Sequence, residues 1–225
     1  MTTLTTQPLA ALLDHLFTES DRAPSPWADP ELANVSAEEQ SRLMHMMHSK
    51  TEYLEFYGRL KDHALPVSRE TGRLLYMLAR GCGARNIVEF GTSFGISTLH
   101  LAAALRDNGG GRLITTEFEP SKVARARGNL TAGGLLDLVE IREGDALQTL
   151  RTDLPDTIDL LLLDGAKALY PAILDLVESR LKTGALIVAD NTDYCPEYLE
   201  RVRAPGSGYL SVPFAEDVEL SMRVG

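Results

Sequence analysis

The chain has 225 residues, of which 44% are hydrophobic and 24% charged, and its formal net charge is -10. This length and composition are typical of one globular domain with a full core. The negative charge, with no basic block, argues against nucleic acid or an anionic membrane surface as a partner. Cys82 and Cys195 lie far apart with no C-x-x-C, which indicates neither a disulfide framework nor a zinc site.

The hydropathy pattern predicts a protein of the cytoplasm. No apolar run approaches the length of a membrane span. The first seven residues lack the basic start and apolar core of a signal peptide. We therefore expect a reduced, cytoplasmic protein with no membrane partner.

The first 66 residues are predicted to form a helical region. Apolar residues recur at helical spacing over 4–17, and Pro24 and Pro26 end this pattern before a linker over 27–34. A second helix is expected over 36–57, where Glu39 stands three residues after Ser36 as in a capping box. Its apolar stripe is more typical of a core or dimer contact than of a cofactor site. His45 and His48, without a third ligand, are expected at the surface.

From residue 68 onward, predicted helices and strands alternate. Helices are expected over 68–81, 96–105, 120–131, 170–181 and 196–203, and strands over 87–90, 112–117, 138–141, 158–163, 185–189, 208–212 and 218–224. The run over 158–163 is almost wholly apolar, as expected of a central parallel strand buried on both faces. The alternation predicts an α/β fold with a Rossmann-like, doubly wound, mostly parallel sheet of seven strands and an N-terminal helical extension.

A glycine turn follows the first of these strands. Gly91 and Gly95 bracket it, and the helix that follows presents free backbone N–H groups to a ligand. The spacing differs from the three-glycine G-x-G-x-x-G fingerprint of dinucleotide-binding proteins. Glu89, just before the turn, would repel a pyrophosphate but suits a ligand with an ammonium or sulfonium group.

Acidic and polar side chains end three of the predicted strands. Glu117 ends the second strand, roughly 25 residues after the glycine turn, where such folds place a ribose-binding acid. Asp164, Asp190 and Asn191 end the fourth and fifth strands, and oxygen ligands of this kind suit Mg²⁺. Lys167 is three residues past Asp164, and a lysine near a metal can have a depressed pKa and act as a base.

Taken together, these motifs resemble the cation-dependent O-methyltransferases, the class I S-adenosylmethionine (SAM) enzymes that include catechol O-methyltransferase and caffeoyl-CoA O-methyltransferase. The matching segments are Val88-Glu89-Phe90-Gly91-Thr92-Ser93-Phe94-Gly95-Ile96-Ser97, Thr115-Thr116-Glu117, Gly144-Asp145-Ala146, Asp164-Gly165-Ala166-Lys167 and Ala189-Asp190-Asn191. The resemblance runs from Val67 almost to the C-terminus. It implies an N-terminal cap or dimer region over 1–66 and a methyltransferase domain over 67–225.

The resemblance also implies roles for individual residues. The methionine part of SAM would be held by Glu89, Gly91, Thr92, Ser93, Gly95 and Ser97. Glu117 would bind the ribose hydroxyls, Asp145 and Ala146 would border the adenine, and Val67 and Asp164 would also touch the cofactor. Asp164, Asp190 and Asn191 match the metal ligands, and Lys167 matches the catalytic lysine.

Two features depart from the family pattern. Catechol O-methyltransferase carries a tryptophan just before its lysine, where this chain has Ala166, so one aromatic wall is absent. The segment between Asn191 and Tyr209 is too short for the substrate loop of the plant caffeoyl-CoA enzymes, which disfavours a CoA thioester.

We therefore predict Mg²⁺-dependent methylation of one hydroxyl of a small catechol-type molecule by a homodimer. The alternatives are an NAD-dependent oxidoreductase and a non-catalytic SAM-binding protein.

Overall fold

A computed structural model describes residues 1–28, 34–214 and 217–225. Its α-helices are α1 (Leu9–Arg22), α3 (Ala37–Met47), α4 (Tyr53–Gly58), α5 (Arg69–Gly81), α6 (Ile96–Asp107), α7 (Pro120–Ala132), α8 (Ala146–Thr149), α9 (Tyr170–Val177) and α10 (Pro196–Arg203). Its strands are β1 (Asn86–Phe90), β2 (Arg112–Glu117), β3 (Val139–Glu143), β4 (Ile158–Leu163), β5 (Leu181–Ala189), β6 (Tyr209–Phe214) and β7 (Val218–Arg223). None of the helices in these ranges is long and apolar enough to cross a membrane.

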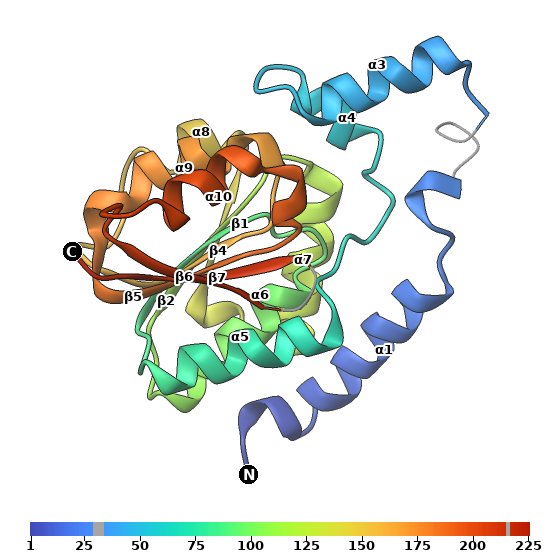
Figure 1. The fold of residues 1–225 in the computed structure, drawn as a ribbon. Coiled ribbons are helices and arrows are strands. Elements are labelled where there is room, and N and C mark those ends of the chain that lie inside the picture. The colour runs from blue at the N-terminus through green and yellow to red at the C-terminus, as the bar shows by residue number, and fades with distance from the viewer. Residues whose placement is uncertain (29–33, 215–216) are drawn as a thin grey trace.

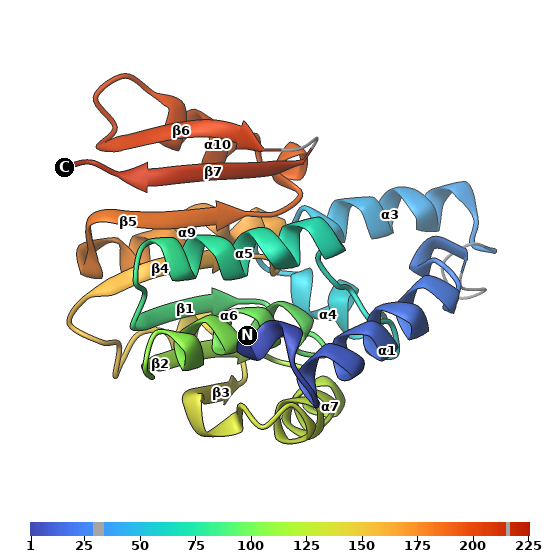
Figure 2. The same cartoon turned by 90° about the horizontal axis from the view of Figure 1, so that it is seen from below.

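The strands form one seven-stranded sheet in the order β3-β2-β1-β4-β5-β7-β6 (Figure 2). Neighbours from β3 to β5 pair in parallel, and β7 is antiparallel to both β5 and β6. The order reverses between β1 and β4, which is the switch point where open α/β sheets bind ligands. The predicted mostly parallel α/β sheet is confirmed.

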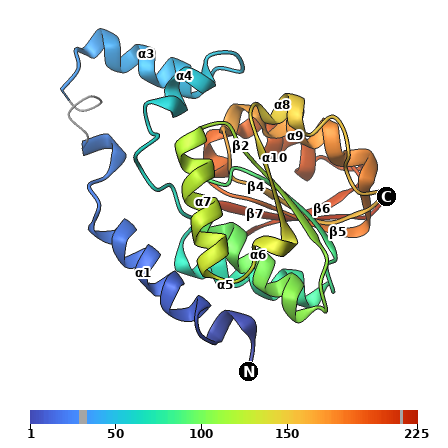
Figure 3. The same cartoon turned by 180° about the vertical axis from the view of Figure 1, so that it is seen from behind.

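Helices cover both faces of this sheet. Figure 1 shows α5 and α6 on one face and α8, α9 and α10 on the other, and Figure 3 shows the same layers from behind. Successive residues of a strand point to opposite faces, so Ile87 packs in the core on the α5–α6 side and Val88 in the core on the α9–α10 side. Every residue of β4 is buried, which explains why Asp159, paired with Lys182, is its only polar residue.

The N-terminal helices lie beyond the carboxyl ends of the parallel strands (Figure 2). One face of α1, including Leu13 and Phe17, packs into the same core as α5 and α6. In contrast, α3 and α4 share a small core of their own, formed by Leu43, Met46, Met47, Phe56 and Leu60. Residues 37–60, which we call the α3–α4 unit, therefore cover the sheet end with a core of their own and join the core on the α9–α10 side through Tyr53. The domain boundary at residue 66 stays a prediction.

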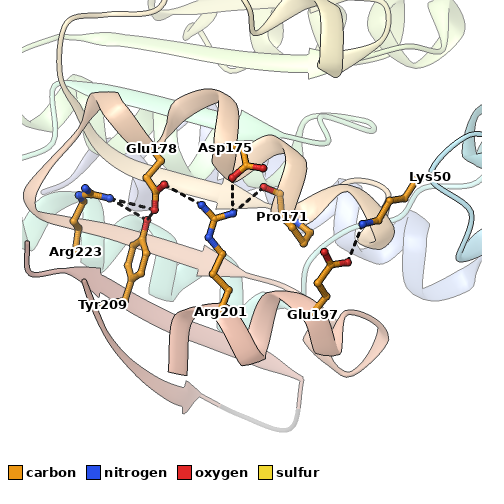
Figure 4. Close-up of polar contacts among 8 residues, drawn as sticks. All are labelled: Lys50, Pro171, Asp175, Glu178, Glu197, Arg201, Tyr209 and Arg223. Atoms are coloured by element: carbon orange, nitrogen blue, oxygen red, sulfur yellow. Dashed lines mark hydrogen bonds and ion pairs between the residues drawn. The ribbon is translucent and has the colours of Figure 1, made fainter. Parts of the chain in front are cut away.

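Side-chain contacts hold the α3–α4 unit over the sheet end. The Lys50 ammonium pairs with Glu197 of α10 at 2.8 Å, with both groups exposed (Figure 4). His48 stacks on Tyr194, with 6.1 Å between ring centroids. Exposed ion pairs contribute little to stability. The packing of this unit and the hydrogen bond from Tyr53 to Asp145 therefore matter more for its placement.

A second polar network joins α9 and α10 to the antiparallel edge of the sheet (Figure 4). Arg201 donates to Asp175 at 2.6 Å and to Glu178 at 2.9 Å. The Tyr209 hydroxyl donates to the other oxygen of Glu178 at 2.5 Å, and Arg223 donates to the Tyr209 oxygen. Burial and the Glu178 carboxylate raise the pKa of Tyr209 to about 12. This network fixes α10, which follows the loop carrying Asp190 and Asn191.

Two predicted helices were wrong in extent. The helix expected over 36–57 is broken between α3 and α4, because the Ser49 hydroxyl oxygen accepts hydrogen bonds from the N–H groups of Thr51 and Glu52 and closes a turn. The helix expected over 170–181 ends at Val177, a 3₁₀ turn follows, and β5 begins at Leu181. Of the predicted linker, residues 29–33 lie outside the described ranges.

Candidate active site

The glycine turn brings the ends of β1 and β4 into close contact. A side chain at Gly91 would place its Cβ 2.5 Å from the carbonyl oxygen of Asp164, and the φ of Gly91 is +104°. Gly95, with φ of 84°, is the N-cap of α6 and faces Ala126 of α7. Only glycine fits both the left-handed backbone and the approach at residue 91. The turn therefore exposes backbone beside the β4 carboxyl end.

Hydrogen bonds from Thr92 and Ser93 fix the turn against β2. The Thr92 hydroxyl lies 2.6 Å from that of Thr115 and donates to the carbonyl of Thr116. The Ser93 backbone N–H donates to Glu117 Oε2 at 2.9 Å. The Ser93 hydroxyl accepts from the Leu65 N–H, which ties the turn to the N-terminal region.

Glu89 is fully buried behind this turn. The hydroxyls of Ser97 and Thr98, from the first turn of α6, donate to its two oxygens at 2.5 and 2.6 Å. Burial raises the pKa of Glu89 to about 7, although these hydroxyls act in the opposite direction. Glu89 therefore anchors the start of α6. Ser97, which donates to Glu89, lines a cavity, whereas Glu89 itself does not.

We predict that Glu89 makes stability depend on pH. In the unfolded chain it titrates near 4.5, and in the folded chain near 7. The folded state therefore keeps its proton while the unfolded state loses it, so stability is full below pH 4.5 and falls as the pH rises towards 7. The loss is about 3 kcal/mol. Urea unfolding from pH 4.5 to 7.5 should show a loss of stability that is larger by this amount in the wild type than in Glu89→Gln, which keeps the other buried carboxyl groups; parallel curves would contradict it.

Glu117 ends β2 as predicted. Its carboxylate accepts from the N–H groups of Ser93 and Glu119, and only 8% of the residue is exposed. Burial raises its pKa, against these hydrogen bonds and the charge of Lys122. For Lys122, burial lowers the pKa against the attraction of the same carboxylate.

Asp145 stands at the N-cap of α8. It accepts from the Leu147 N–H at 2.9 Å, and its Oδ1 also accepts from the Tyr53 hydroxyl of α4 at 2.7 Å. Burial, together with this hydrogen bond, raises the pKa of Tyr53. The α3–α4 unit thus reaches a predicted adenine-binding residue, a contact that the sequence did not indicate.

Three cavities open around these strand ends. The first, about 70 Å³, is lined by residues including Glu117, Asp145, Ala146 and Tyr53; we call it the cofactor cavity. A second, about 10 Å³, adjoins it and is lined by residues including Thr92 and Ser97. The third is much larger, about 470 Å³, and its lining includes Lys167, Asp190 and Asn191; we call it the acceptor cavity.

Three of the predicted cofactor residues, Val67, Glu89 and Gly95, line none of these cavities. Asp164 lines all three cavities, and Gly91 and Ser93 line the first two. Val67 is 2% exposed and packs in the hydrophobic core; its neighbours Leu65 and Pro66 line the second and third cavities instead. Neither Val67 nor Gly95 is among the described residues lining these cavities.

Asp164 and Asp190 form a buried carboxyl pair. Burial raises the pKa of both, and for Asp190, whose pKa reaches about 7, repulsion from Asp164 adds to it. Lys167 Nζ donates to Asp164 Oδ1 at 2.9 Å. Burial lowers the pKa of Lys167, but attraction to Asp164 and other groups raises it by more, so it stands well above its usual value. Attraction to the two carboxyl groups therefore raises the pKa of Lys167, whereas the sequence suggested a depressed value.

Asn191 adopts a left-handed backbone with φ of 49°. Its Nδ2 donates to Asp217 Oδ2 at 3.0 Å, and Asp217 disfavours the charged forms of both Asp164 and Asp190. The sequence did not single out Asp217, because it precedes β7 rather than ending a parallel strand. In the described ranges, no group of three or more His, Cys, Asp and Glu side chains could hold a metal ion. The predicted set has two carboxyl groups and one amide, and these oxygen donors fit a hard divalent cation.

Comparison with known proteins identifies the family of this chain. A family profile described as "Methyltransferase domain" matches residues 88–192. Catechol O-methyltransferase of Bos taurus is 30% identical over 184 residues, covering 75% of this chain and 67% of that protein. The chain belongs to the class I SAM-dependent O-methyltransferase family.

Two further proteins that resemble this O-methyltransferase family member are also O-methyltransferases. Catechol O-methyltransferase of Niastella koreensis is 38% identical over 131 residues, which are 57% of this chain and 58% of that protein. The match thus spans less than two thirds of that relative. An O-methyltransferase of Bacillus cereus, solved in complex with SAH, has a TM-score of 0.63 and 25% identity, and covers 88% of this chain and 96% of its own. Membership favours methyl transfer over the oxidoreductase alternative.

Proposed function

We propose that this protein transfers a methyl group from SAM to one hydroxyl of an ortho-diphenol, with the aid of Mg²⁺ or another divalent cation. The observation that carries this proposal is the acceptor cavity: Asp164, Lys167, Asp190 and Asn191 all line it, beside the glycine turn of the cofactor cavity. A homodimer and a cytoplasmic location also stay predictions.

The residues of the cofactor cavity would bind SAM. Glu117 keeps oxygen lone pairs for the ribose hydroxyls in addition to its two backbone hydrogen bonds. Asp145 and Ala146 would border the adenine. The methionine part would lie along the turn, where Gly91 and Ser93 line both of the smaller cavities and Thr92 and Ser97 line the second. Glu89 would support this part from behind by holding Ser97.

At the acceptor cavity, Asp164, Asp190 and Asn191 would hold the cation. SAM supplies an electrophilic methyl group, and a divalent cation supplies positive charge that lowers the pKa of a phenol. Lys167, once it has released its own ammonium proton to solvent, would take the proton from the hydroxyl that attacks. Because Asp164 holds the Lys167 ammonium in its charged form, the charge on this carboxylate decides how readily the lysine gives up its own proton. The walls of the two cavities would align the reactants, which is the larger contribution to the rate.

The function can be tested with methyl-labelled SAM, Mg²⁺ and a panel of ortho-diphenols. We expect one labelled methyl group per acceptor, with SAH as the second product. Calorimetric titrations with SAM and with NAD should show heat of binding for SAM alone. Binding of SAM without transfer to any diphenol would favour the non-catalytic alternative.

We predict that Glu117→Gln weakens SAM binding about 10- to 100-fold, because hydrogen bonds to a charged group contribute about 1.5–3 kcal/mol each. Calorimetry measures this directly. Glu143→Gln is the matched control, since Glu143 pairs with Glu117 in the register of β2 and β3 but is exposed. Equal affinities of the two variants would contradict the ribose-binding role.

A further inference from the structure

The acceptor cavity is much larger than a single-ring diphenol requires. Its volume is about 470 Å³, whereas a cavity of about 150 Å³ is enough for one benzene ring. Sites for drug-sized ligands span about 300–1,000 Å³. A lone catechol ring would leave most of this space unfilled.

The lining is polar at one pole and apolar over most of the rest. Asp164, Lys167, Asp190 and Asn191 gather at the strand ends, where the reacting oxygens would lie. The α3–α4 unit contributes Met47, Phe56, Tyr57 and Leu60. The rings of Phe56 and Tyr57 meet edge to face, with 5.1 Å between centroids. These packed aromatic side chains suit further rings of a ligand.

The last turn of α1 and the segment after it add another wall. Ser20, Ala23, Pro24 and Pro26 line the cavity and carry no charge. Prolines restrict the backbone here, and α1 itself is packed in the main core through Leu16 and Phe17. This wall lies at and beyond the end of a helix that is anchored independently of the α3–α4 unit.

The charge of the lining disfavours an anionic acceptor. Lys167 is the only lysine or arginine among the described residues of the cavity, and it is already paired with Asp164. His63 is the other basic side chain there, and the charges of Asp164 and Asp190 would be offset by the cation of the proposed function. A carboxylate or phosphate on the substrate would find no arginine fork of the kind that binds such groups.

We propose that the acceptor is an uncharged aromatic molecule of two or more rings, with its two adjacent hydroxyls at the Asp164–Asp190 pole and its remaining rings between α4 and the end of α1. This inference rests on the proposed function and adds the size and charge of the substrate. The chain's own residues thus select a bulky neutral ortho-diphenol over a small or anionic one.

The test compares three acceptors with the full-length chain: 3′,4′-dihydroxyflavone, 4-methylcatechol and caffeate. We expect kcat/KM for the flavone to exceed that of each other acceptor at least about tenfold, which is about 1.4 kcal/mol, because its further rings bury apolar surface in the cavity. Calorimetric titration in the presence of SAH and Mg²⁺ should give the same order of affinities. Equal or higher values for 4-methylcatechol or caffeate would overturn the inference.

A variant tests the wall at the end of α1. Ser20→Phe should reduce the ratio of kcat/KM for the flavone to that for 4-methylcatechol by at least about tenfold, since the larger side chain fills the space that the further rings would occupy. Ser41→Phe, on an exposed position of α3, is the matched control and should keep the ratio. An unchanged ratio in Ser20→Phe would overturn the placement. Tight binding of the flavone with no transfer to any diphenol would support this inference while contradicting the proposed function.

Discussion

Replacing Lys167 by methionine is expected to lower kcat by about 10²- to 10⁴-fold, the usual contribution of a positioned acid or base. The Lys167 side chain is 13% exposed, lines the acceptor cavity and bonds Asp164. It does not line the cofactor cavity, so the Kd of SAM should stay within about threefold. Single-turnover kinetics and calorimetry together measure both effects.

Loss of the lysine also leaves Asp164 without its ion-pair partner, which can destabilise the fold. Lys167→Arg separates the two effects, because arginine keeps the positive charge and cannot act as a base. Its kcat should fall as far as that of Lys167→Met, with a melting temperature nearer the wild type. Lys182→Met is the matched control: Lys182 pairs with Asp159 and lines none of the three cavities. A kcat for Lys167→Arg within a few-fold of the wild type would remove the lysine from proton transfer.

The sheet could be predicted because its sequence signals are local. The apolar run of β4 and the glycine turn after β1 each determine their own segment, and strand–helix alternation restricts the topology. The break between α3 and α4 was missed because the apolar stripe continues through it. The hydroxyl of Ser49 closes a turn that ends the helix there. The sequence Ser-Lys-Thr over 49–51 was the local pattern that could have indicated this turn.

Part of the candidate site could be predicted because several of its residues end parallel strands. Glu117, Asp164 and Asp190 are such residues, and the sheet brings them to one edge. The contact of Tyr53 with Asp145 joins residues 92 positions apart, so no local pattern indicates it. Tyr57 was assigned to an apolar stripe, yet it lines both the cofactor and the acceptor cavities.

The charge state of Lys167 could not be obtained from sequence for a related reason. It depends on the distance to Asp164 and on how far both groups are removed from water, which three-residue spacing alone does not give. The same holds for Asp217, which enters the site through its bond with Asn191. Spacing thus indicates which groups meet, and their burial determines their protonation.

Removal of divalent cations is expected to lower turnover at least about 100-fold, with recovery on addition of Mg²⁺. The physical reason is the buried pair of Asp164 and Asp190, whose pKa values are raised by burial and, for Asp190, by repulsion from Asp164. Each of these carboxylates disfavours ionisation of the other, and a bound cation would offset their mutual repulsion. Activity in EDTA, before and after titration with Mg²⁺, measures the effect.

Binding can be separated from activity by thermal unfolding. Mg²⁺ should raise the melting temperature of the wild type, since a ligand that binds only the folded state stabilises it. Asp190→Asn should lose most of this rise, because it removes one of the two carboxylates while keeping the side-chain size. Asp193→Asn, three residues further along the same loop and exposed, should keep it. Full turnover in EDTA, together with equal Mg²⁺ responses of these two variants, would show that Asp164, Asp190 and Asn191 serve the site without a cation.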